Sequence, residues 1–155
     1  MGDQKPPRVH ADERTTILAL LQYQRESFLR KVSGVGDVLG GTASVASGTT
    51  LLWLANHMAD AERTWLLHRF QGANPGDDPP HEPTIAEALI RYRNTWALVD
   101  AVVASSPDLD AICPDFDGEA SVSLRWILLH LLEETARHAG HADILRELVD
   151  GKTGR

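Results

Sequence analysis

Residues 133–148 read EETARHAGHADILREL, an uninterrupted helical pattern that places one glutamate and two histidines at positions where a bundle helix is normally apolar. At about 100° per residue, His138 lies in the middle of the leucine stripe of this helix. Glu134 lies one turn earlier on the same face, and His141 lies one turn later beside it. A buried carboxylate and buried imidazoles need partners, and one helix seldom supplies them all. We therefore expect other helices to complete this face.

Three more segments show apolar residues at the three-and-four spacing of an amphipathic helix. The expected helices are residues 12–32, 50–70, 84–105 and, from Ser121 or Ser123, onward to 149. Thr84 and Glu87 have the spacing of a capping box at the start of the third helix. Helix-breaking loops separate the helices, and the loop at residues 106–120 is compatible with a short strand or a turn. The pattern predicts an all-α protein built as a four-helix bundle.

Length and composition limit the class of protein. The chain has 155 residues, a net charge of −7 and one cysteine, Cys113, so it can hold one domain without an internal disulfide. We expect a flexible leader at residues 1–11 and a single domain over residues 12–155. Acidic and basic residues alternate, which argues against nucleic-acid binding, and the absence of a long apolar run argues against a membrane span. These features favour a cytoplasmic protein.

A metal site is the function that the polar groups favour. His57 lies in an apolar setting on the second helix, and it can converge with Glu134 and His138 on a divalent cation, as in other bundle sites. Such a ligand set suits zinc, and also nickel, iron or manganese, and three protein ligands leave an open position. The alternative is structural: Glu134 pairs with Arg137, and the histidines are hydrogen-bonded core or rim residues. The chain has no HExxH motif, and Cys113 is a poor candidate nucleophile.

Two blocks of the chain carry a resemblance to a known family. WLANHMADAERTWLLHRFQG (53–72) and HLLEETARHAGHADILRELVDGKTG (130–154) resemble the DinB-like superfamily, and more closely its actinobacterial branch of mycothiol-dependent S-transferases and maleylpyruvate isomerase. The likeness covers residues 13–155. It implies a divalent metal, often zinc, held by His57, Glu134 and His138. Many DinB-like proteins have histidine in place of Glu134, so His141 is either a further ligand or a residue behind the ligands.

The same resemblance implies a function. The metal of that branch binds the thiol of a small cofactor, so mycothiol or another low-molecular-weight thiol, together with a small electrophile, would be the partners. Arg63 and Arg137 could contact carboxylates of cofactor or substrate, although such arginines are more often in surface ion pairs. The alternatives are a metal-dependent isomerase or hydrolase of a small acid, and a non-enzymatic metal-binding bundle. The sequence assigns no catalytic residue, and a monomer or a homodimer is compatible with it.

Overall fold

The computed structural model describes residues 4–114 and 118–153. The long helices are α1 (Glu13–Val32), α3 (Leu51–Glu62), α4 (Ile85–Ser105) and α5 (Leu124–Asp150). α3 continues directly into a π-helix, η1 (Arg63–Phe70), so the two together form one rod. The prediction of an all-α four-helix bundle is confirmed. Among the described residues, none of the helices combines the length and the apolar character that crossing a membrane requires.

Each long helix starts at a polar residue that caps its first turn. The caps are Asp12, Thr50, Thr84 and Ser123, and each accepts a hydrogen bond from the backbone N–H three residues later. The expected pair of Thr84 and Glu87 is present, with the threonine hydroxyl 2.6 Å from Glu87 Oε2. Such caps satisfy backbone donors that a helix leaves free and contribute about 1 kcal/mol each. The sequence therefore sets where the helices begin.

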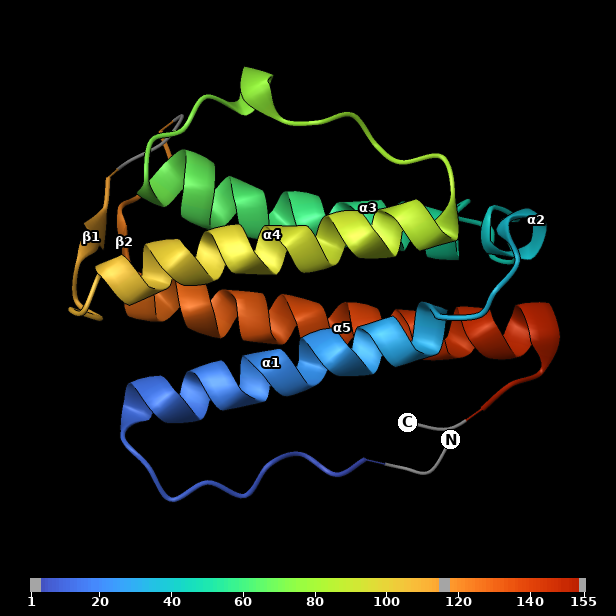
Figure 1. Ribbon diagram of the computed structural model, residues 1–155, viewed down its shortest axis with the longest axis horizontal. Helices are drawn as coiled ribbons and strands as arrows, with labels where there is room; N and C mark the ends of the chain where they lie inside the picture. Colours follow the sequence, from blue (N-terminus) through green and yellow to red (C-terminus); the bar gives the residue numbers. More distant parts are fainter. Residues whose placement is uncertain (1–3, 115–117, 154–155) are drawn as a thin grey trace.

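The long helices associate as two pairs. α1 packs most extensively on α5, α3 packs most extensively on α4, and α3 also contacts α5. The segment from 71 to 84, which includes the short 3₁₀ turn η2 (Pro75–Asp77), returns along the bundle, so α3 and α4 run in the same direction (Figure 1). α1 and α5 run in the opposite direction. The antiparallel arrangement of α3 and α5 decides which of their side chains meet.

A buried ion pair interrupts the apolar core. Arg25 on α1 donates from Nε and Nη2 to the two carboxylate oxygens of Glu62, at 2.9 and 2.6 Å. The hydroxyl of Tyr92 on α4 donates to the same carboxylate at 3.0 Å, and Glu62 itself is fully buried. Because Glu62 is the last residue of α3, this network lies where the α-helix gives way to the π-helix. The sequence analysis did not predict either feature.

The glycine-rich connection after α1 contains a short helix, α2 (Asp37–Gly40), which the sequence analysis also did not predict. α2 approaches the start of α4 closely. A Cβ atom placed on Gly40 would lie 2.6 Å from Cγ1 of the buried Ile85. The carboxylate of Asp37 also accepts a hydrogen bond from the backbone N–H of Ile85 at 2.9 Å. Only a glycine at position 40 allows this contact without displacement of Ile85.

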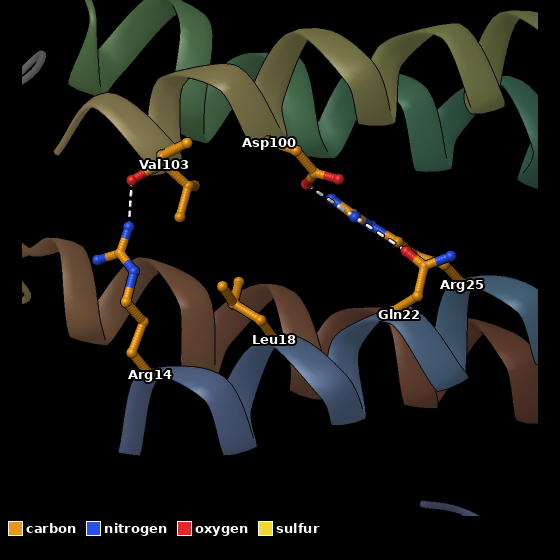
Figure 2. A pocket seen from close by; sticks show the side chains of 7 residues that line it. Arg14, Leu18, Gln22, Arg25, Asp100 and Val103 are labelled. Atoms are coloured by element: carbon orange, nitrogen blue, oxygen red, sulfur yellow. Dashed lines mark hydrogen bonds and ion pairs between the residues drawn. The ribbon is translucent and has the colours of Figure 1, made fainter. Parts of the chain in front are cut away.

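The seam between α1 and α4 is bridged by arginines. A slot of about 480 Å³ lies there, and Figure 2 shows Arg14 and Arg25 reaching across it from α1. Arg14 donates to the main-chain oxygens of Val103 and, at 3.0 Å, Ser106. Arg25 donates to Asp100 at 2.9 Å. Since both guanidinium groups are hydrogen-bonded across the slot, we infer that these arginines stabilise the packing of α1 beside α4.

The connection between α4 and α5 resolves the open question about a strand. β1 (Ile112–Cys113) pairs antiparallel with β2 (Val122–Ser123), and Cys113 lies opposite Val122. Ser123 then caps α5 directly, so this hairpin sets the position at which α5 leaves the loop.

The expected leader, residues 1–11, is described from residue 4 onward, and its first three residues lie outside the described part. Residues 4–11 are exposed and form neither helix nor strand. The Tyr23 hydroxyl donates to the main-chain oxygen of Gln4 at 2.7 Å. The flexibility of the leader stays a prediction.

Candidate metal centre

The structure brings His57, Glu134 and His138 together, as the sequence predicted. His57 comes from α3, and the other two lie one turn apart on α5. Their candidate ligand atoms all lie within 4.8 Å of one another. His138 Nε2 is 3.1 Å from Glu134 Oε1, and His57 Nε2 is 3.8 Å from the same oxygen. Two helices that are distant in sequence therefore direct three donor atoms to one point.

Aromatic contacts hold the ring of His57. It stacks on the indole of Trp53, with ring centroids 4.7 Å apart and an interplanar angle of 9°. The ring of His138 also meets it nearly edge-on, at 4.8 Å and 81°. Trp53 lies one turn earlier on α3 and is half exposed, so it covers one side of the centre next to solvent. These contacts restrict the orientation of the His57 imidazole.

The electrostatics of the cluster favour the protonation states that bind a cation. Burial disfavours the charged form of Glu134, but the charge and hydrogen bond of His138, with smaller contributions from Arg137 and His130, lower its pKa overall. Burial and the nearby His57 lower the pKa of His138, against the opposing effect of Glu134. An ionised carboxylate beside a neutral imidazole is the form required for metal ligation.

The spacing of the donors also fits a cation. In a tetrahedral zinc site with bonds of about 2.0–2.1 Å, neighbouring ligand atoms are roughly 3.3 Å apart. The two spacings to Glu134 Oε1, 3.1 and 3.8 Å, lie on either side of that value. One carboxylate and two imidazoles form a mixed set that suits zinc and other first-row divalent metals. The residues present therefore fit a three-ligand metal site.

His141 lies next to this group rather than within it. Its Nδ1 is 3.2 Å from Nδ1 of His138, while the opposite nitrogen of His138 faces Glu134. His141 is exposed at the end of the cluster. This geometry suits a residue that orients His138 from behind.

The two arginines considered as cofactor contacts are both in ion pairs. Arg63 pairs with Asp78 of the 71–84 connection, with Nε 2.8 Å from the carboxylate. Arg137 pairs with Glu133 at 3.0 Å and lies 3.8 Å from Glu134 Oε2. Arg137 thus borders the centre, whereas Arg63 anchors the connection.

Three aromatic rings that the sequence analysis did not connect lie next to the candidate metal centre, on η1 and the first half of α5. Trp65 of η1 lies 5.1 Å from Trp126 and 5.1 Å from His130, measured between ring centroids. Trp126 and His130 are stacked at 4.9 Å. The four-residue spacing of Trp126, His130 and Glu134 was a signal for one shared face. The contribution of Trp65 depends on the helix pairing and was not visible in the sequence.

The comparisons with known proteins agree with this architecture. A family model described as Mycothiol-S-transferase matches residues 16–151. A crystal structure of a DinB-like protein from Bacillus cereus has 19% identity and a TM-score of 0.66, over 84% of this chain and 89% of that one. A conserved protein from Enterococcus faecalis has 16% identity and a TM-score of 0.61, over 92% of this chain and 100% of that one. No curated protein matches. The predicted DinB-like fold is confirmed.

Proposed function

This chain belongs to the mycothiol-S-transferase family, and from that premise we propose that it is a metal-dependent S-transferase. It would join a low-molecular-weight thiol of the mycothiol kind to small electrophiles. The observation that carries the proposal is the convergence of His57, Glu134 and His138 from two helices. A closed structural site would need a fourth protein ligand, whereas this donor set has three and leaves a position for a thiol.

Each residue of the centre has a role in this proposal. His57, Glu134 and His138 would hold a divalent cation, zinc being the metal that the donor set suits best. Such a cation would stabilise the thiolate form of the cofactor near neutral pH. Trp53 keeps the His57 ring in place, and His141 keeps that of His138 in place. Rigid ligands keep the donor atoms in position while the two substrates bind.

The reaction is a nucleophilic displacement. The thiol loses its proton to solvent, and its sulfur forms a bond to the electrophilic carbon. The bond from that carbon to the leaving group breaks, and the leaving group departs with the electron pair. No redox co-reactant is needed, so a thiol and an electrophile are sufficient substrates.

The test uses cobalt in place of zinc. Adding mycothiol to the cobalt-loaded protein should produce a sulfur-to-cobalt charge-transfer band, and the zinc-loaded protein should convert monobromobimane to its thiol conjugate, detected by mass spectrometry. Glu134→Gln removes the ligand charge and should weaken both the band and the rate. His81→Ala is the control, because His81 is exposed, pairs with Asp60 at 2.6 Å and is not one of the three candidate ligands.

The proposal fails if cobalt-loaded protein shows no band with mycothiol or other small thiols and conjugate formation does not exceed that of metal-free protein. The chain would then be a metal-binding bundle without transferase activity.

A further inference from the structure

The ring cluster of Trp65, Trp126 and His130 lies beside the metal centre and is partly open to solvent. Trp126 is 44% exposed, a large apolar area for one side chain to leave in water. Its indole stacks on His130 with an interplanar angle of 16°, and Trp65 closes the cluster from η1. The centroids of the three rings lie 4.9–5.1 Å apart. A cluster of aromatic rings at this spacing can bind another planar ring by stacking or edge-to-face contact.

The cluster is continuous with the candidate metal centre. His130 precedes Glu134 by one turn on α5, a rise of about 6 Å along the helix axis, and it contributes to the lowered pKa of Glu134. α3 and η1 run opposite to α5 (Figure 1), so Trp65, eight residues after His57, meets His130, eight residues before His138. The π-helix has a wider turn than an α-helix, so fewer degrees separate successive residues and Trp65 stays closer to the face of His57. The rings and the candidate ligands therefore follow one another along the same face of α5.

A cavity of about 180 Å³ extends the cluster toward the β-hairpin. Its lining includes Trp65, Trp126, Cys113 and Val122, which are apolar or weakly polar. Among the described residues, the charged side chains of the lining are Arg69 and Glu119. They are hydrogen-bonded to each other at 2.8 Å, and the Arg69 guanidinium lies 4.2 Å from the centroid of Trp65. A hydroxyl-rich sugar would need polar partners in exchange for its lost water. The described lining instead consists mostly of aromatic and other apolar or weakly polar side chains, which suit an apolar planar ligand.

We propose that Trp65, Trp126 and His130 bind the aromatic part of the electrophile, so the preferred substrates are planar conjugated electrophiles. This inference rests on the proposed function. The rings would hold the planar group, and its reactive carbon would face the neighbouring residues Glu134 and His138, which would hold the metal that activates the thiol. With a bromomethyl arene, the carbon–sulfur bond forms as the carbon–bromine bond breaks, and bromide leaves with the bonding electrons.

Binding and reaction are tested separately. The probe for binding is syn-(methyl,methyl)bimane, which has the ring system of monobromobimane without a leaving group. Trp126→Leu in the zinc-loaded protein should raise its Kd about 3- to 10-fold, the range expected for loss of an aromatic pair. The matched control is Ile144→Ala, an exposed apolar residue (58%) on the same helix, roughly 27 Å further along. This control should leave the Kd unchanged.

The reaction is measured with two electrophiles. Trp126→Leu should raise KM for monobromobimane by a similar factor and leave KM for iodoacetamide, which has no ring, within about twofold. Cys113 is buried, and parallel reactions without mycothiol measure any reaction of the protein's own thiol with either electrophile. If Trp126→Leu does not fold, Trp65→Leu serves as the second variant from the opposite rod.

The binding arm decides the inference independently of activity. Equal Kd values for Trp126→Leu and Ile144→Ala, or no bimane binding by the protein without either change, would overturn it. If a ring variant raises KM for mycothiol and leaves bimane binding unchanged, the rings contact the sugar part of mycothiol and not the electrophile. That result would also overturn the inference. Bimane binding that depends on Trp126 in a protein without transferase activity would support the ring site and refute the proposed function.

Discussion

Nδ1 of His138 lies 3.2 Å from Nδ1 of His141, one turn further along α5. A hydrogen bond at Nδ1 fixes the ring so that Nε2 faces Glu134. We predict that His141→Ala retains the metal but binds it about 10- to 100-fold more weakly, as measured by competition with a chromogenic chelator. A loss as large as that of His138→Ala would instead make His141 a ligand.

The ligand assignment itself predicts which histidines matter. The purified protein should bind about one divalent ion per chain, measured by inductively coupled plasma mass spectrometry. His57→Ala and His138→Ala should each abolish that binding. His68→Ala and His81→Ala should not, because these side chains pair with Asp78 and Asp60, respectively. Equal retention in all four variants would refute the assignment.

The sequence was sufficient for the positions of these histidines because helical periodicity places residues on faces. His138 interrupts a leucine stripe, and that stripe must face the other helices. Periodicity identifies the buried face of each helix. It does not identify which other helix packs on that face, or which side chains come into contact. The contact between Trp65 and Trp126 and the ion pair of Arg25 and Glu62 depend on that pairing, so they could be found only in the structure.

The π-helix was missed for a related reason. It spans eight residues, Arg63–Phe70, and continues α3 directly with no capping side chain at its start, so the sequence has no start signal there. Leu66 and Leu67 are buried and continue the apolar pattern of α3. The short helix α2 was missed because its glycine-rich sequence is typical of a loop, and its position depends on packing against Ile85.

The buried pair of Arg25 and Glu62 should be sensitive to the loss of either member. Glu62→Ala removes the buried partner of Arg25 and leaves its guanidinium only the half-exposed carboxylate of Asp100. We therefore expect a loss of about 3–5 kcal/mol in the free energy of unfolding, measured by urea denaturation. The double variant Arg25→Met/Glu62→Leu should lose much less than the sum of the two single changes, because it removes both charges. Additive losses would show that the two residues stabilise the bundle independently.

Two glycines should respond to alanine in opposite directions. Gly40→Ala places a methyl group 2.6 Å from Ile85 Cγ1, so the unfolding free energy should fall by about 1–3 kcal/mol. Gly140→Ala, inside α5 with no neighbouring atom within 4 Å of the new Cβ, should raise it by about 0.5–1 kcal/mol. Thermal unfolding of both variants is the measurement. A stabilised Gly40→Ala would contradict the close approach of α2 to α4.

The association of the helices in two pairs links metal binding to the motions of the bundle. His57 belongs to the pair of α3 and α4, and Glu134 and His138 belong to the pair of α1 and α5. A cation held by all three binds only when the pairs are closed on each other, so it adds to the stability of that closed state, by about 2.7 kcal/mol at a concentration 100 times its Kd. Amide hydrogens of α3 and α5 should then exchange with deuterium more slowly in the metal-loaded protein, while those of the exposed residues 4–11 exchange at the same rate with or without metal.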